Sequence, residues 1–335
     1  MKILAAAALA GSCLLGTGGT ASAETIKLGT LAPEGTPWYE IARDMAEAWK
    51  ALSHGRIELR IYAGGIAGDE DSVIRKMRVG QLHAAVLSAG GLSDIAPEFR
   101  AFYLPMMFDS YEELDYVLDR KRAQLEAILE AKGFKVLNWG DAGWVRFFSQ
   151  RPVVDPDDLR AQRLFWWEAG GAYIEALKDA GFQPVPLAAT EMHTALESGL
   201  INAFGAPAIA ALAFQWFALA PHMTDLNWAP LIGATVITTK EWQAVPDDLK
   251  PAFLAAARDA GAKMKDGIRR LEDQAIEVMK KYGLVVHHVP PEIAAKWAAA
   301  ARAVYPQLIG HAVPAEMASD VQKLRDEFRA ARGGE

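Results

Sequence analysis

Short apolar runs of strand length alternate along this chain with longer stretches of helical periodicity, and this alternation constrains its fold most strongly. The predicted strands are Thr25–Thr30, Ile57–Ala63, Ala84–Ser88, Lys135–Gly140, Arg163–Trp167, Gln183–Leu187, Ala234–Lys240 and Leu284–Val289. Alternating strands and helices indicate α/β layers built on largely parallel sheets. The predicted fold class is therefore α/β.

Three of the intervening stretches predict helices, and two of them have a recognisable C-terminal end. Apolar residues recur at helical spacing in Pro37–His54 and Tyr111–Lys132, which are followed by Gly55 and Gly133 as C-terminal stops. The stretch Asp247–Tyr282 is apolar at helical spacing over a much greater length. We expect one long or once-bent helix there, able to run along two lobes.

Residues 1–23 have the pattern of a secretory signal peptide. Lys2 precedes an Ala/Leu-rich run that ends at Ala21-Ser22-Ala23, a small-x-small cleavage pattern. The apolar run is too short and too broken for a membrane span, which needs about 20 apolar residues. A lipoprotein anchored through Cys13 is the alternative, but the residues before Cys13 fit such a signal poorly. Cleavage after Ala23 and a periplasmic location are predicted.

Composition excludes several classes of function. Cys13 is the only cysteine, so the mature chain has no disulfide, thiol nucleophile or thiolate metal site. A net charge of −7 argues against a nucleic-acid partner. Chains of about 300 residues usually divide into two domains. Because no Pro-, Ser- or Gly-rich linker is present, strands or helices must join any two lobes.

Many short segments match one transporter family in order and spacing. They are Ile26–Gly29, Gly55–Leu59, Gly64–Asp69, Gly80–Val86, Ala96–Phe99, Tyr103–Phe108, Asp158–Gly170, Thr190–Asn202 and Glu241–Pro246. In these segments, which span nearly all of the mature chain, the protein resembles the DctP-like solute-binding proteins of tripartite ATP-independent periplasmic (TRAP) transporters.

The resemblance implies a two-lobed periplasmic binding protein fold, with hinged lobes, a ligand cleft between them and a long helix spanning both. Residues 24–143 and about 231–270 would form lobe I, and residues 144–230 and about 271–335 lobe II. Such proteins close around one small molecule and deliver it to an integral-membrane permease driven by an ion gradient. The implied partners are a small-molecule ligand and the TRAP permease subunits, with no cofactor. The oligomeric state stays open.

The chain departs from the family at the residues that grip the ligand. The usual ligands are organic carboxylates, held by an arginine seven positions after the Asp of an Asp-Leu pair, where a guanidinium binds a carboxylate bidentately. Counting from Asp158 places Phe165 there, and a second family arginine falls at Val145. A buried carboxylate without a paired donor costs several kcal/mol. The departure predicts a different class of ligand.

Other positions of the family's pocket change in the same direction. The turn that often offers an amide to the ligand carries Phe204 and Ala206 here, and Ser88 and Ala189 replace larger side chains. Small residues widen a cavity and aromatic residues line it. We predict an apolar or aromatic-rich cleft for a hydrophobic ligand. Its predicted lining residues are Phe165, Trp167, Phe204, Ala206, Val145, Ser88, Ala189, Trp38 and Arg163.

Plainer interpretations stand beside this prediction. Phe165 and Trp167 fit ordinary core packing, and Trp38 fits either a cleft cap or the core. Arg163 shares a strand face with Phe165, so it is a candidate for a relocated carboxylate clamp, although it also fits a solvated surface charge. Arg146 would reach the cleft by a one-residue slip of its strand. An organic-carboxylate binder is therefore the alternative function.

The sequence lacks the common catalytic and metal-binding motifs. The sequence has no HExxH, GxSxG or P-loop motif. His287 and His288 would point to opposite faces of a strand. The acidic run Asp69–Asp71 is predicted to cap a helix rather than bind calcium. The protein is predicted not to be an enzyme and to bind no metal; a secreted enzyme on the same fold is the competing class, since fold alone does not exclude it.

Overall fold

A computed structural model describes residues 24–167 and 171–333. The strands are β1 (Glu24–Thr30), β2 (Ile57–Tyr62), β3 (Ala84–Ser88), β4 (Phe134–Ser149), β5 (Arg163–Trp167), β6 (Gln183–Leu187), β7 (Ala203–Pro207), β8 (His222–Asp225), β9 (Ala229–Thr238) and β10 (Val285–His288). Each of the eight predicted strands corresponds to one of these. The predicted signal peptide and Cys13 lie outside the described residues.

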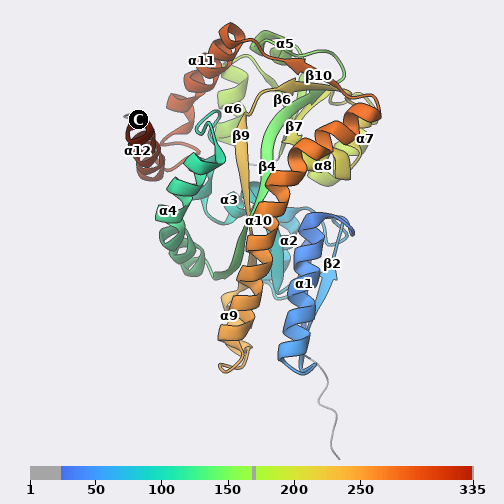
Figure 1. The fold of residues 1–335 in the computed structure, drawn as a ribbon, viewed down its shortest axis with the longest axis vertical. Helices are drawn as coiled ribbons and strands as arrows, with labels where there is room; N and C mark the ends of the chain where they lie inside the picture. The colour runs from blue at the N-terminus through green and yellow to red at the C-terminus, as the bar shows by residue number, and fades with distance from the viewer. Residues whose placement is uncertain (1–23, 168–170, 334–335) are drawn as a thin grey trace, which may run out of the picture.

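Helices surround the sheet on both sides (Figure 1). They are α1 (Pro37–Leu52), α2 (Glu70–Arg78), α3 (Ala89–Ile95), α4 (Tyr111–Ala131), α5 (Pro156–Arg160), α6 (Gly171–Asp179), α7 (Met192–Glu197), α8 (Ala208–Ala213), α9 (Thr239–Ala244), α10 (Lys250–Lys281), α11 (Pro291–Leu308) and α12 (Ala315–Arg332). Short 3₁₀ helices are η1 (Pro97–Tyr103), η2 (Ala189–Glu191) and η3 (Trp216–Ala218). The three predicted helices are confirmed as α1, α4 and α10.

The sheet follows the order β2-β1-β3-β9-β4-β7-β5-β6. β1 pairs in parallel with β2 and β3, and β5 pairs in parallel with β6 and β7. The long strands β4 and β9 lie antiparallel to each other at the centre. The outer parts are therefore parallel, as predicted, and an antiparallel pair joins them. β4 continues to Ser149, well past the predicted end at Gly140.

This arrangement is the predicted two-lobed α/β fold. α10 packs against α1, β4 and α8, so one helix runs along both lobes, as Figure 1 shows. In β4, register shifts occur between Val136 and Asn138 and between Asp141 and Gly143. The second shift lies at the predicted boundary between residues 143 and 144. Bulges of this kind bend a strand, so this position suits a hinge.

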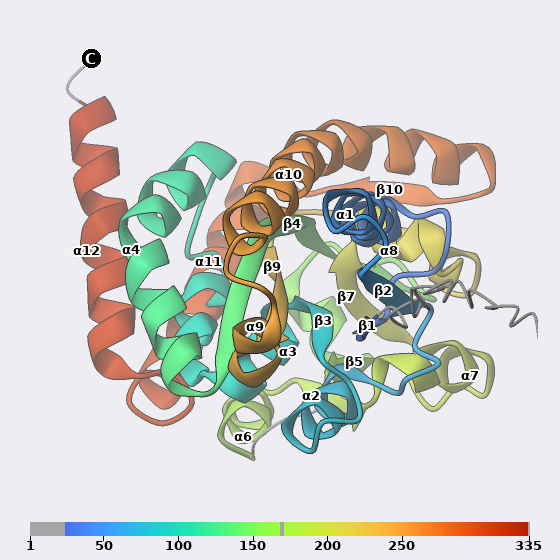
Figure 2. The ribbon, with the colours of Figure 1, turned by 90° about the horizontal axis from the view of Figure 1, so that it is seen from below.

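The two C-terminal helices pack against different parts of the molecule. α11 packs against α5 and α6, and the indole Nε1 of Trp297 donates to the Val154 carbonyl at 2.7 Å. α12 instead packs against α4 and η1, and the two helices lie side by side in Figure 2. Arg329 Nε is 2.5 Å from Glu113 Oε1, and Lys121 pairs with Asp320. α12 thus contacts elements that the prediction assigns to lobe I, and the assignment of 271–335 to lobe II stays a prediction.

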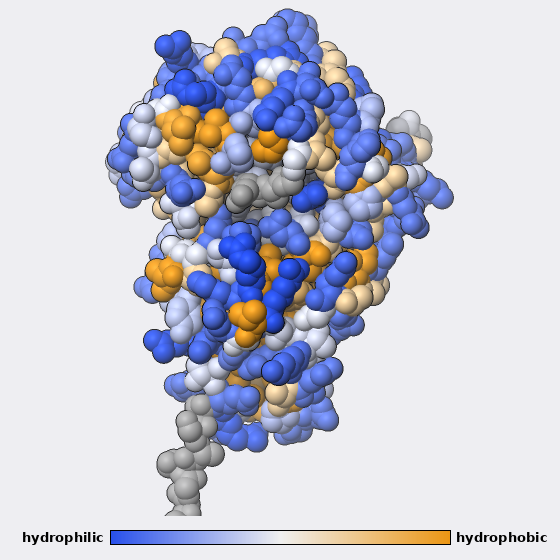
Figure 3. All heavy atoms as spheres, turned by 180° about the vertical axis from the view of Figure 1, so that it is seen from behind, coloured by the Kyte–Doolittle hydropathy of each residue, from blue (hydrophilic) through white to orange (hydrophobic). Residues whose placement is uncertain are grey.

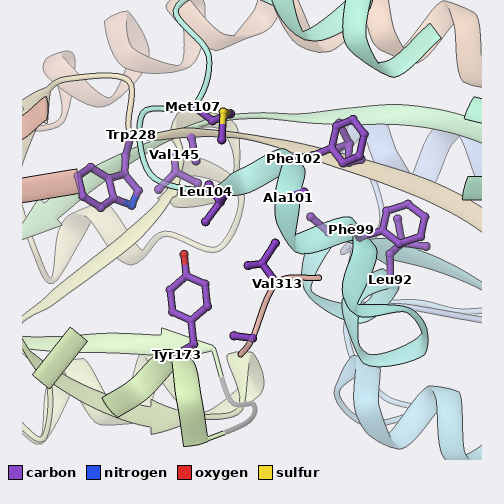
Figure 4. Close-up of a cluster of buried hydrophobic side chains, with 14 of the residues drawn as sticks. Leu92, Phe99, Ala101, Phe102, Leu104, Met107, Val145, Tyr173, Trp228 and Val313 are labelled. Atoms are coloured by element: carbon purple, nitrogen blue, oxygen red, sulfur yellow. The ribbon is translucent and has the colours of Figure 1, made fainter. Parts of the chain in front are cut away.

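One buried apolar cluster contains residues from η1, from β4 and from the loop before β9. η1 and the segment after it contribute Phe99, Phe102 and Leu104, while Val145 and Trp228 come from β4 and the loop before β9 (Figure 4). Each of these side chains is at most 9% exposed. Elsewhere the face shown in Figure 3 is mostly hydrophilic, with apolar atoms in separate patches. No described helix combines the length and apolar character needed to cross a membrane.

Candidate functional site

A cavity of about 370 Å³ lies between the two lobes. This volume falls within the range of about 300–1,000 Å³ typical of small-molecule sites. Elements from both lobes form its wall. The lining residues include Thr30, Trp38, Glu70, Val86, Ser88, Asn138, Asp141, Phe165, Trp167, Ala189, Met192, Ala206, Phe214, Trp216, Leu231, Thr235 and Met264.

Six of the predicted site residues lie together in this wall: Trp38, Ser88, Phe165, Trp167, Ala189 and Ala206. Phe165, in β5, is 4% exposed. The indole Nε1 of Trp38 donates to the Asp141 carbonyl at 3.3 Å, which holds this ring from α1 against β4. Phe165 also belongs to a buried apolar cluster, and Trp167 packs against that cluster, so both residues line the cavity at the edge of the core. Their contact with a ligand stays a prediction.

Three predicted lining residues lie outside this wall: Phe204, Val145 and Arg163. Phe204 is fully buried in the lobe II core, where its ring stacks on Phe148 with 5.1 Å between centroids. It packs edge-on behind Trp216, which lines the cavity in its place. Val145 lines an adjoining, smaller cavity of about 130 Å³, whose wall shares Ser88, Phe165 and Trp167 with the first cavity and includes Arg100.

Arg163 does not reach either cavity. It is the exposed first residue of β5, and its Nε and Nη2 atoms donate to the carbonyl of Gly199 at 3.1 and 2.6 Å. Its Nε also donates to the Leu200 carbonyl at 3.2 Å. These bonds satisfy carbonyls just beyond the end of α7. The interpretation of Arg163 as a solvated, structural charge fits the structure better than a relocated clamp.

Arg146 is buried but is held by a carboxylate on the α10 side of β4. Its Nη1 lies 2.7 Å from Glu272 Oε1, and both side chains are at most 10% exposed. Glu272 also accepts from the Trp144 backbone and the Tyr111 hydroxyl, each at 2.9 Å. Neighbouring residues of a strand face opposite sides of the sheet. The one-residue slip that would bring Arg146 to the position of Val145 is not seen. Arg146 is not among the residues that line the cavity.

The charged side chains of the cavity wall are acidic apart from His193. Among the described lining residues there is no lysine or arginine. Asp141 is paired with Arg269 Nε at 2.6 Å, and burial raises the pKa of its carboxyl. Glu70 is 4% exposed, and its hydrogen-bond donors among the described residues are all neutral. Burial raises the pKa of Glu70 to about 7.

A hydrogen bond joins the lobes at the edge of the cavity. Asp69 Oδ2, at the start of α2, accepts from the backbone amide of Ala189 in η2 at 2.9 Å. Asp69 Oδ1 accepts from the Glu70 amide at 2.9 Å, which confirms the predicted helix cap. The same carboxylate therefore caps a lobe I helix and contacts lobe II.

Sequence reasoning missed several wall residues. Phe214 and Trp216 stack with 4.5 Å between ring centroids, and Met264 reaches the cavity from α10. The sequence does show two aromatic residues, Phe214 and Trp216, separated by one position. Their placement depends on Gln215, whose left-handed backbone (φ 58°) the sequence does not announce. Asn138 was also overlooked because a lone strand asparagine carries no motif.

No group of three or more histidine, cysteine, aspartate or glutamate side chains suited to a metal occurs in the described part of the chain. His287 Nε2 is 2.9 Å from His222 Nδ1, whereas His288 lies 3.9 Å from Asp225. The two adjacent histidines thus have different partners.

A two-lobed α/β fold with a cavity between the lobes is that of a periplasmic solute-binding protein. This chain belongs to the DctP family, bacterial extracellular solute-binding protein family 7, which matches residues 28–310. The family comprises the binding proteins of TRAP transporters and acts in substrate binding and transport.

Named relatives agree with this assignment. The 2,3-diketo-L-gulonate-binding periplasmic protein YiaO of Escherichia coli is 23% identical over 269 residues, which cover 79% of this chain and 81% of YiaO. The sugar acid binding protein DctPAm of Advenella mimigardefordensis, solved with galactonate, superposes with a TM-score of 0.85 at 20% identity over 91% and 99% of the chains. A TRAP binding protein of Sulfurospirillum deleyianum with bound succinate has a TM-score of 0.83 at 24% identity over 90% and 99%.

Proposed function

We propose that this TRAP-type solute-binding protein captures a small, uncharged and largely apolar ligand, and delivers it to the membrane permease of its importer. The observation that carries the proposal is the wall of the cavity itself. Phe165 lies where the family resemblance places the carboxylate-binding arginine, and no described lining residue is a lysine or arginine. Trp38, Trp167 and Trp216 add aromatic surface. Such a wall suits a ligand whose binding is dominated by apolar contact.

The electrostatics of the wall oppose an organic acid. Moving a carboxylate out of water costs several kcal/mol unless donors or cations compensate it. Here the acidic wall residues are Glu70 and Asp141, and Asp141 is already paired with Arg269. An anionic ligand would therefore find no lysine or arginine among the described residues of this wall. A neutral ligand avoids this cost.

An organic-carboxylate binder is the second candidate, because galactonate and succinate occupy two of the similar structures. In this chain it would need a cation that reaches the cavity. Arg163 is bound to carbonyls at the surface, and Arg146 is paired with Glu272. Either arginine would have to leave its partners to serve as a clamp. This requirement makes the carboxylate binder the weaker candidate.

The proposed mechanism is capture by closure. A ligand in the cavity contacts both lobes at once, so it favours the closed arrangement over an open one. The bond from Ala189 to Asp69 would form in the closed state only. Transport requires no catalytic group, in keeping with a family of binding proteins. We further propose that residues 1–23 direct export to the periplasm and are removed there.

Thermal shift measurements on the mature protein test the ligand class. The panel contains lipids, neutral aromatic compounds and short carboxylates. A ligand at 100 times its Kd stabilises the protein by about 2.7 kcal/mol, which gives a clear rise in Tm. We expect neutral aromatic or lipid-like compounds to raise Tm. If short dicarboxylates alone do so, the proposal fails.

A Phe165→Arg variant tests the residue at the centre of the proposal. We expect neutral ligands to bind about 100-fold more weakly, equivalent to about 2.7 kcal/mol, because the guanidinium must be desolvated when they bind. Phe165→Leu is the matched control, since it keeps an apolar wall and should lose far less affinity. Unchanged binding by Phe165→Arg would place Phe165 outside the ligand site.

A further inference from the structure

The side-chain amide of Asn138 lacks a hydrogen-bond partner although the residue is buried. Asn138 lies in β4 and is 3% exposed, and its Nδ2 atom has no partner within the described part of the protein. Buried polar groups are nearly always paired, because an unpaired donor has lost its bonds to water without replacement. In a binding protein, a ligand is a natural source of the absent acceptor.

Asn138 lies in the wall of the 370 Å³ cavity. On the neighbouring strand β9 it faces Thr235, which lines the same cavity. The strand register shifts immediately before it: Val136 pairs with Val236 and Asn138 pairs with Thr235, so Leu137 is extra. Bulges re-aim side chains and are frequent beside binding sites. Leu137 belongs to the lobe I core, and Asn138 lines this cavity and also borders a second cavity beside α10.

Helix α10 restricts the freedom of Asn138. A β-carbon on Gly261 would lie 2.7 Å from Asn138 Cβ and 2.6 Å from the Trp139 carbonyl oxygen. Only glycine permits this close approach of the helix to β4. The amide is therefore carried by a paired strand and backed by a helix. Rigid placement of this kind reduces the entropy that a binding group loses when it engages a ligand.

Three other polar groups of the wall already have protein partners. Trp38 Nε1 donates to the Asp141 carbonyl, and Ser88 Oγ donates to Glu70 Oε2 at 2.7 Å. The Asp141 carboxylate is paired with Arg269. The Nδ2 donor of Asn138, by contrast, takes part in none of these hydrogen bonds. It is neutral, so it can bind an oxygen acceptor without requiring a charged ligand.

We infer that Asn138 is the polar anchor of the ligand site, with its Nδ2 donating to an uncharged carbonyl oxygen on an otherwise apolar ligand. The inference rests on the proposed function, since it assumes that this cavity holds the ligand. A ketone, ester or amide carbonyl meets the requirement. A carboxylate does not, because one neutral donor cannot offset its charge beside Glu70 and Asp141.

The test uses three probes with one ring and different substituents: acetophenone, ethylbenzene and benzoate. Titration calorimetry measures their Kd values with the mature protein. We expect acetophenone to bind about tenfold more tightly than ethylbenzene, the effect of one good hydrogen bond. In Asn138→Ala this ratio should fall to about one. Benzoate should bind more weakly than acetophenone to both proteins.

Two further variants separate binding from folding. Asn138→Asp keeps the size and one acceptor but lacks the amide donor, so it should lose the preference for acetophenone as Asn138→Ala does. Asn202→Ala removes an amide outside the cavity, whose Oδ1 accepts from the Arg163 backbone at 2.7 Å, and should leave the ratio unchanged. The Tm of ligand-free Asn138→Ala should stay close to that of the wild type, because the Nδ2 atom that is removed has no protein hydrogen-bond partner among the described residues.

The possible failures are distinguishable. If acetophenone and ethylbenzene bind the wild type equally, or if Asn138→Ala keeps the preference, the anchor role is wrong while the apolar site stands. If benzoate binds and the two neutral probes do not, the proposed function is wrong as well. Binding of neither neutral probe overturns both proposals.

Discussion

Glu70 and Glu272 are both buried glutamates, but the structure satisfies them in different ways. Glu272 accepts from the guanidinium of Arg146 at 2.7 Å as well as from the Trp144 amide and the Tyr111 hydroxyl. Glu70, on the cavity wall, accepts only from neutral donors: the amide and hydroxyl of Ser88 and the amide of Gly91, at 2.6 to 2.9 Å. The guanidinium of Arg146 thus lies in the α10–β4 interface and not in the cavity wall.

The contrast suggests that the arginines near β4 serve to pair buried carboxylates and do not serve the cavity. A buried arginine requires a carboxylate nearby, and a guanidinium already paired in this way has little capacity left for a ligand acid. Arg146 and Arg269 both have such carboxylates, in Glu272 and Asp141. The cavity consequently keeps its apolar character. Three experiments would break or sharpen this contrast.

The largest effect is expected from Glu272→Ala. This change leaves the guanidinium of Arg146 buried without its carboxylate, and removing one partner of a buried pair costs about 3–5 kcal/mol. Chemical denaturation measures the loss in the free energy of unfolding. Replacing both residues, Arg146→Met with Glu272→Met, should recover most of it.

An exposed ion pair provides the control for that experiment. Glu197→Ala removes a partner of His193 at 3.4 Å, and both side chains are more than half exposed. We expect a change within about 0.5 kcal/mol. A loss below about 1 kcal/mol in Glu272→Ala would show that Arg146 does not depend on this carboxylate.

Glu70 should make the protein less stable as pH rises. Burial raises its pKa to about 7 from an ordinary value of 4.5, so folding favours the protonated carboxyl. The stabilisation is complete below pH 4.5 and is lost as pH rises through 7, an effect on the order of 3 kcal/mol. Urea denaturation across this range should show a smaller fall in stability for Glu70→Gln than for the wild type.

Other carboxyls contribute to the same slope. Burial also raises the pKa values of Asp69, Asp141 and Glu272, and these groups are present in both proteins. The difference between the two slopes therefore isolates Glu70. Equal slopes would mean that Glu70 is ionised without penalty in the folded protein.

The fold could be predicted from sequence to a large extent, because periodicity and ordered family segments both report on it. α10 was foreseen over nearly its full length, and its observed span is Lys250–Lys281. β4 was cut short at Gly140 because its glycines resemble breaks in a strand; in the structure Gly143 adopts a φ of 113° at the second bulge. The packing of α12 on α4 was missed because the helix pattern does not identify its neighbour.

The site was predictable where a family position fixed the geometry. Phe165 and Ala206 line the cavity, and both were named from their places in family motifs. Phe204 was misplaced because the motif gives a position on a strand and not the face of that strand. The position of Asn138 in the wall could not be predicted, because the strand register shifts just before it and the shift has no local sequence signal.

Arg163→Ala should have the smallest effect and tests the relocated clamp directly. The change removes hydrogen bonds from an exposed guanidinium to the carbonyls of Gly199 and Leu200, so the free energy of unfolding should fall by about 0.5–1 kcal/mol. Because Arg163 lies outside the cavity, the Kd of any ligand identified in the thermal shift panel should stay within about twofold. A loss of tenfold or more, with carboxylates alone affected, would instead mean that Arg163 moves into the cleft when the ligand binds. The apolar wall around Phe165 would then be only one part of an anion site.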